Sequence, residues 1–196
     1  MKKCRQTSSL KIALITMALI GATSCNDTKK PEDTKDVAEE HNEAKFDNTS
    51  KEKDSQFLVD AAEINLEEIQ LGHLAQQNSN MSDVKELGEM MEREHGKSLI
   101  DLNALAAKKM IKVPASLTDN AKNSYDKLNK KSGKEFDKEY CEMMVKGHKD
   151  AIALFDKALK ECSDSDIRDW ASATLPALRI HLDQAITCQK KCEKFN

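Results

Sequence analysis

Histidine interrupts the apolar side of several segments that otherwise have the spacing of amphipathic helices. In the stretch EMMVKGHKDAIALF, residues 142–155, apolar side chains recur every three or four residues except where His148 stands. His95 and His181 occupy equivalent positions in two further segments, and Glu68 does so in a fourth. Residues with this spacing share the buried face of a helix, so the sequence predicts three imidazoles and one carboxylate in a protein core.

Imidazole nitrogens and a carboxylate together form a ligand set for Fe, Mn, Zn or Cu. A buried carboxylate is costly unless it is paired or bound to a cation, and one shared metal would satisfy Glu68. Glu92 is a further candidate ligand, because residues three apart on a helix share a face. Candidates for orienting the ligands are Glu94, Asp137 and Tyr140. The alternative is a metal-free cluster in which Glu68 accepts hydrogen bonds from the histidines.

Four long helices must position these groups, and their limits follow from caps and apolar periodicity. The expected ranges are 54–78, 82–109, 134–162 and a last helix that begins at 165 and extends to about 192. A short additional helix is expected between the break at Pro114 and Gly133. With short loops at 79–81 and 163–164, the pattern predicts an all-α, up-down four-helix bundle that forms one domain, residues 55–194.

The four polar positions lie at similar depths in such a bundle. Both short loops would lie at one end, and counting from them places Glu68 about 12 residues deep. The same count gives about 15 residues for His95 and His148 and about 17 for His181. At 1.5 Å per residue the depths are roughly 18 to 26 Å. The side chains therefore fall within about two helical turns of one another, which favours a common site.

Four cysteines lie in the expected helical domain. Cys141 and Cys188 fall at similar depths on neighbouring helices, so a disulfide could join them if their α-carbons approach within about 4.4–6.8 Å. Cys188 and Cys192 are one turn apart and could instead supply half of a soft-metal site, or serve as small core residues. Cys162 has no evident partner in the sequence.

The N-terminal region has the anatomy of an export signal. Four basic residues precede an apolar run from Ile12 to Ala22, which is followed by small residues and Cys25. This pattern predicts a lipoprotein signal peptide at 1–24 and lipidation of Cys25, with a plain signal peptide as the alternative. Residues 25–54 are almost wholly polar and are expected to form a disordered linker. The lipid would attach the domain to a membrane of the cell envelope, in the periplasm or at the outer membrane.

Net charge excludes one class of partner. After residue 24 the chain has 27 lysine and arginine residues against 34 acidic ones, a net charge of −7. This balance opposes binding to nucleic acid or to anionic lipid through charge. The sequence also has no phosphate-binding loop, nucleophile elbow or HExxH motif, so hydrolase activity has little support, while other enzymatic activity stays open.

Several motifs in combination resemble a known bacterial family. They are EIQLG around Glu68, EREH ending at His95, FDKEY at Phe136, and LPALRIH ending at His181. The region that contains them, residues 54–187, is similar to the domain-of-unknown-function 4142 family. This resemblance implies an exported, ferritin-like helical bundle of the kind often named as an outer-membrane protein.

Ferritin-like di-iron sites combine two carboxylates with two Glu-x-x-His pairs. Glu68 and the pair formed by Glu92 and His95 match half of that pattern. The third helix offers His148 rather than glutamate, and Leu178 stands where the second pair needs a glutamate. These departures favour a mononuclear, histidine-rich site over a di-iron centre.

Two functional interpretations follow from the sequence. One is an exported lipoprotein whose ferritin-like bundle holds a transition metal in a histidine-rich core site. The other is a non-catalytic interaction or structural lipoprotein of the cell envelope, in which a metal-free polar cluster fixes the register of the helices. Metal content before and after replacement of the histidines separates the two.

Overall fold

The computed structural model describes residues 32–46 and 49–194, and within these residues the chain forms six α-helices and no strand. The helices are α1 (Thr34–Lys45), α2 (Thr49–Asn78), α3 (Ser82–Lys109), α4 (Asp119–Asn129), α5 (Gly133–Glu161) and α6 (Ser165–Lys194). The prediction of an all-α chain is confirmed for this part of the sequence.

The observed helix limits coincide with local backbone signals. α3 begins at Ser82 as expected and ends where Met110 adopts a left-handed conformation, with φ 57°. α4 begins after Thr118, whose side-chain oxygen accepts a hydrogen bond from the backbone N–H of Ala121. α2 is longer than expected, since it begins at Thr49 rather than at Asp54. Periodicity and caps therefore predict the long helices to within a few residues.

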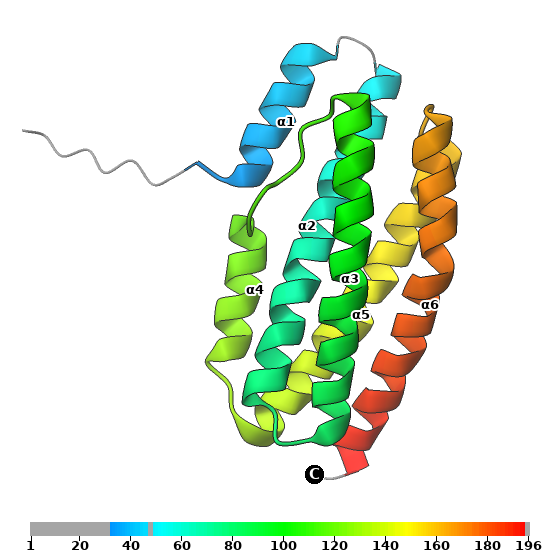
Figure 1. The fold of residues 1–196 in the computed structure, drawn as a ribbon. Helices are drawn as coiled ribbons and strands as arrows, with labels where there is room; N and C mark the ends of the chain where they lie inside the picture. The colour runs from blue at the N-terminus through cyan, green and yellow to red at the C-terminus, as the bar shows by residue number, and fades with distance from the viewer. Residues whose placement is uncertain (1–31, 47–48, 195–196) are drawn as a thin grey trace, which may run out of the picture. The chain divides into compact units, whose positions relative to one another are not determined.

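The four long helices α2, α3, α5 and α6 lie side by side, as Figure 1 shows. α2 packs against α3 and α5, while α6 packs against α5 and α3. α2 and α3 approach each other closely at two glycines, since a Cβ on either Gly72 or Gly88 would lie 2.6 Å from the carbonyl oxygen of the other. Only glycine allows this backbone approach, which fixes how α2 and α3 are aligned.

The buried residues form two apolar clusters separated by a polar layer. One cluster contains Phe57, Leu102 and Phe155, and the other contains Met91, Phe136 and Met144. Each long helix passes from one cluster to the other, and five buried polar residues lie at the crossing. These residues are Asn65 and Glu68 on α2, His95 on α3, His148 on α5 and His181 on α6. The helical register therefore brings the three histidines to the same level of the core.

The expectation of a disordered linker is wrong for α1 and the start of α2. Asn42 holds α1 by a pair of hydrogen bonds with Lys112, donating to its carbonyl oxygen at 2.7 Å and accepting from its N–H at 2.9 Å. Lys35 adds an ion pair with Glu63 on α2 at 2.6 Å. These contacts are mostly polar, which is why a composition poor in apolar residues suggested disorder.

The folded unit consequently begins earlier than the predicted limit at residue 55, because α1 belongs to the same compact unit as the other helices. The predicted signal peptide and the lipidation site Cys25 lie outside the described residues. Within the described ranges, none of the helices has both the length and the apolar character required to cross a membrane.

Candidate metal centre

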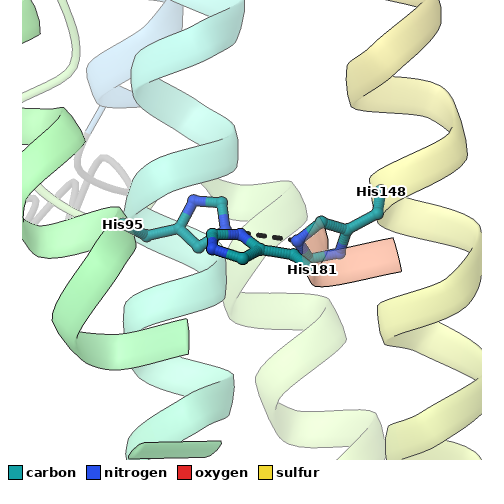
Figure 2. A group of neighbouring side chains, drawn as sticks. All are labelled: His95, His148 and His181. Atoms are coloured by element: carbon teal, nitrogen blue, oxygen red, sulfur yellow. Dashed lines mark hydrogen bonds between the residues drawn. The ribbon is translucent and has the colours of Figure 1, made fainter. Parts of the chain in front are cut away.

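Three histidine side chains meet in the polar layer of the core. His95 comes from α3, His148 from α5 and His181 from α6, and all three are buried. Figure 2 shows the rings pointing toward one another from three different helices. The ring centroids are 5.4 Å apart for every pair, so they form a regular triangle. One ring nitrogen of each histidine lies within 4.8 Å of the other two.

Hydrogen bonds on the outer side of the triangle determine which nitrogen carries the proton in two of the rings. Nδ1 of His148 donates to the carbonyl oxygen of Met144 at 2.8 Å. Nδ1 of His95 lies 2.9 Å from Oδ1 of Asn65, whose own amide nitrogen donates to the carbonyl oxygen of Ala61. Because these oxygens only accept, both Nδ1 atoms carry a hydrogen, and Nε2 of each neutral ring keeps its lone pair.

The two Nε2 atoms of His95 and His148 then face each other at 3.4 Å. A hydrogen bond between them would need one ring to become an imidazolium. Burial, together with the neighbouring histidines, lowers the pKa of His95 well below its ordinary value. Burial also lowers the pKa of His148 to about 4 and depresses the pKa of His181. At neutral pH the rings are therefore uncharged, and the facing lone pairs repel unless a cation lies between them.

The spacing of the nitrogens suits a metal ion. Two nitrogens bound at about 2.0–2.1 Å to a tetrahedral zinc ion are roughly 3.3–3.4 Å apart, and the Nε2 atoms of His95 and His148 have this separation. Nδ1 of His181 is buried and has no hydrogen-bond partner within the described residues, a cost that coordination through it would remove. Three protein ligands would leave a fourth tetrahedral position open, as in catalytic rather than structural zinc sites.

Glu68 lies beside the triad rather than in it. Its Oε1 is 3.8 Å from Nδ1 of His148, on the side of the ring that faces away from Nε2. Gly147 makes room for this carboxylate, because a Cβ there would lie 2.9 Å from Oε1. Burial raises the pKa of Glu68 well above its ordinary value, and Oε2 has no hydrogen-bond partner in the described part of the chain. The structure thus places this predicted ligand beside His148 and outside the histidine triad.

Glu68 has two further neighbours, the side chain of Tyr140 and a surface pocket. The Tyr140 hydroxyl is buried without a hydrogen-bond partner among the described residues, and burial and the charge of Glu68 raise its pKa. A pocket of about 340 Å³ between α2, α4 and α5 is lined by Glu68, Met144 and Gly147, among others. Glu68 therefore lines this pocket and also lies 3.8 Å from the ring of His148.

The other predicted carboxylates are not among the close ligand atoms at the histidines. Glu92 is half-buried and accepts a hydrogen bond at 2.5 Å from a glutamine side chain of α2. Glu94 accepts from Arg93, and this hydrogen bond lowers its pKa. Asp137 is buried next to the turn between α2 and α3, where it accepts from the hydroxyl of Ser79 at 2.5 Å. These contacts give Glu92, Glu94 and Asp137 local structural partners.

Three of the four cysteines in the described ranges also meet in the core. Sγ of Cys141 lies 3.3 Å from Sγ of Cys188 and 3.5 Å from Sγ of Cys192. The pair Cys141 and Cys188 that spacing predicts is thus in contact, but as free thiols, since a disulfide bond is about 2.05 Å long. One turn of α6 separates Cys188 from Cys192, and this turn brings both against the same residue of α5.

Asn65 is the residue of the site that apolar periodicity did not identify. It lies on the buried face of α2, three residues before Glu68, and orients His95 through its amide oxygen. An amide at an otherwise apolar position, one turn from a buried carboxylate, is the signal that could have found it. Which atom it contacts depends on side-chain orientation, which spacing does not give.

Comparison with known proteins gives one match. A family model described as Domain of unknown function (DUF4142) matches residues 39–187, which is 149 of the 196 residues. The matched range contains all three histidines and Cys141, and it ends just before Cys188. No curated protein and no solved structure matches the chain.

Proposed function

The chain belongs to the family described as Domain of unknown function (DUF4142), whose description names no activity, and we propose that its core binds a transition metal through three histidines. The observation that carries this proposal is the 3.4 Å contact between Nε2 of His95 and Nε2 of His148, each ring with its proton on Nδ1. A cation at this point converts the repulsion of two lone pairs into coordination. Zn, Cu and Fe suit imidazole ligands, whereas Mn prefers oxygen ligands.

The proposal includes the architecture that holds the site. The long helices α2, α3, α5 and α6 would form a ferritin-like, up-down four-helix bundle, in which metal ligands project inward from facing helices. Three of these helices supply a histidine, and α2 supplies the orienting groups Asn65 and Glu68. The site would be mononuclear, because Glu92 is engaged with a glutamine rather than directed at the histidines.

Glu68 would balance the charge of the bound ion. A nearby cation favours the ionised form of a carboxyl group, so metal binding would oppose the rise in the pKa of Glu68 that burial causes. The carboxylate would then strengthen the ring of His148 as a ligand from 3.8 Å away.

The location of the protein is a separate part of the proposal. An exported lipoprotein, attached to a membrane of the cell envelope in the periplasm or at the outer membrane through Cys25, is supported by the basic residues, apolar run and ATSC stretch of the N-terminus. Mass spectrometry of the mature N-terminal peptide should find acylated Cys25, and Cys25→Ser should abolish acylation. A mature protein that begins at another residue contradicts this.

Elemental analysis of protein purified without chelator or nickel resin tests the metal site. Each of the variants His95→Ala, His148→Ala and His181→Ala should lower the bound metal by about one equivalent, because the three nitrogens act as one ligand set. His73→Ala is the matched control, since His73 is an exposed histidine on α2. Metal content that is the same in all four variants and in the unchanged protein contradicts the proposal.

The alternative is a non-catalytic envelope interaction or structural lipoprotein with a metal-free polar cluster. The bonds from His148 to Met144 and from His95 to Asn65 favour it, because neither requires a metal. A tightly bound metal stabilises the folded state, so chelator should lower the melting temperature of the metal-binding protein. A melting curve that chelator leaves unchanged, together with metal content indifferent to the histidines, identifies the alternative.

A further inference from the structure

Cys141, Cys188 and Cys192 form a second cluster of ligand atoms in the same core. All three side chains are buried, and their sulfur atoms lie within 4.8 Å of one another. Cys141 precedes His148 by seven residues on α5, and Cys188 follows His181 by seven residues on α6. Seven residues of helix rise by about 10 Å. The thiols therefore lie on the same inward faces as the histidines but about two turns away, as a separate site.

The sulfur atoms of the cluster are in direct contact with one another. The thiol of Cys141 donates to Sγ of Cys188, and this hydrogen bond lowers the pKa of Cys188 while it raises the pKa of Cys141. Burial raises the pKa of Cys192 to about 11. The proposal rests on this clustering of three sulfur atoms, because sulfur is the ligand atom that soft metal ions prefer.

Further ligands near the cluster are also sulfur or backbone oxygen. Sδ of Met81 lies 3.9 Å from Sγ of Cys192, and the backbone oxygen of Asp137 lies at the same distance. The hydroxyl of Ser79 donates to the side chain of Asp137, which ties the turn that carries Met81 to α5. Three thiols therefore lie within 4.8 Å of one another, and a thioether lies beside one of them, Cys192.

We propose that Cys141, Cys188 and Cys192 bind Cu(I), with the thioether of Met81 as an additional neutral donor. Thiolate and thioether are soft ligands that select Cu(I), while structural zinc sites take four cysteine or histidine ligands. A disulfide would use two of the sulfurs and leave the third without a partner. Binding requires no redox step, because the ion enters as Cu(I) and the thiols that coordinate it release their protons to solvent.

The ion has access to the cluster from the surface. A pocket of about 290 Å³ between α3 and α6 is lined by Cys188 together with Asp83 and Glu86, among others. Glu86 at this pocket can attract a cation, whereas Asp83 is paired with Lys191, which also lines the pocket. Cys188 and Cys192 lie beyond the residues that match the family model, so the proposal concerns this chain rather than the family.

A Cu(I) titration of the reduced, full chain under anaerobic conditions tests the proposal, with a chromogenic Cu(I) chelator as competitor. Each cysteine variant is made both in the unchanged protein and in the His148→Gln variant. Copper that is bound only when His148 is present is then assigned to the histidines. Loss of a residue that only contacts a metal ligand weakens metal binding ~10–100-fold. Because Cys141 and Cys188 are proposed as ligands themselves, Cys141→Ser and Cys188→Ser should weaken Cu(I) binding by more than this in both backgrounds. Cys162→Ser, at the end of α5, is the matched control and should bind normally.

Thiol alkylation of the unchanged protein covers the case in which a cysteine variant fails to fold. One equivalent of Cu(I) should protect Cys141, Cys188 and Cys192 from alkylation but not Cys162, as peptide mass spectrometry would show. Equal alkylation with and without Cu(I) overturns the proposal, and so does Cu(I) affinity that both serine variants retain. The proposal is also overturned if the cysteine cluster retains Zn(II) more strongly than Cu(I) when the two ions compete for it. None of these outcomes depends on whether the histidines bind metal.

Discussion

The ring of His95 is held by a single amide oxygen, that of Asn65, and the amide is held in turn by the carbonyl oxygen of Ala61. This chain of hydrogen bonds decides which nitrogen of His95 faces His148. The histidines themselves could be predicted, because an imidazole on an apolar helix face is visible in the spacing of residues. Neither the role of Asn65 nor the displacement of Glu68 from the ligand set could be, since both depend on side-chain orientation.

Loss of the Asn65 amide should weaken metal binding without removing a ligand. In Asn65→Ala, the ring of His95 loses the acceptor that keeps the proton on Nδ1, and affinity should fall roughly 10–100-fold. Competition with a metal chelator of known affinity measures this change. Asn103→Ala, an exposed asparagine on α3, serves as control and should leave the affinity unchanged. Equal affinities for both variants would show that the amide does not orient the ligand.

Titration of His148 should give the metal-free protein a characteristic pH dependence. Because burial lowers the folded pKa of His148 from 6.5 to about 4, the unfolded chain binds a proton at pH values where the folded chain does not. The neutral ring therefore contributes stability above pH 6.5 that is lost as the pH falls toward 4. Relative to His148→Gln, which cannot titrate, the loss should be on the order of 3 kcal/mol.

Urea unfolding in the presence of chelator, at several pH values between 4 and 7, measures this difference between the two proteins. The raised pKa of Glu68 acts in the opposite direction, since its stabilising effect is lost as the pH rises, but it affects both proteins alike. A stability difference that does not change with pH would mean that His148 is not held neutral in the folded core.

At the scale of helices, the alignment of α2 and α3 depends on two glycines that touch across the interface. The ranges of α3, α5 and α6 could be predicted because long apolar periodicity ends at short loops there. α1 could not, because mostly polar contacts, among them those of Asn42 and Lys35, hold it to distant segments. Contact between helices that are far apart in sequence carries no periodic signal.

Enlarging one glycine of this contact should separate the two helices. In Gly88→Ala, the new methyl group would lie 2.6 Å from the carbonyl oxygen of Gly72, and the backbone shift should cost about 1–3 kcal/mol. Gly96→Ala is a control on the same helix, where a Cβ meets no atom within 4 Å and should stabilise by about 0.5–1 kcal/mol. Urea denaturation measures both changes. Similar stability effects for the two variants would contradict the close packing.

At the scale of the whole molecule, a polar layer divides the apolar core into two clusters, and α1 extends the folded unit toward the N-terminus. The polar layer could be predicted, because the polar residues lie at similar depths along their helices. The extent of the folded unit could not be, because residues 34–45 are too polar for composition to predict their order. The metal site and the cysteine site occupy neighbouring levels of this one core.

The attachment of α1 should depend on Asn42. In Asn42→Ala, the backbone of Lys112 loses both hydrogen bonds to α1, and the free energy of unfolding should fall by about 1–3 kcal/mol. Hydrogen exchange should show faster exchange across α1, with protection retained in the centres of α2 and α3. Unchanged protection of α1 would mean that other contacts hold this helix in place.

Nitrogen NMR of the histidine side chains, with assignments from the glutamine variants, tests the central claim most directly. In the metal-free protein at neutral pH, His95 and His148 should both be neutral with the proton on Nδ1. Addition of one equivalent of Zn(II) should shift the Nε2 resonances of both residues and leave their Nδ1–H groups in place. An imidazolium, a proton on Nε2, or Nε2 resonances that no added metal changes would contradict a metal site between these rings.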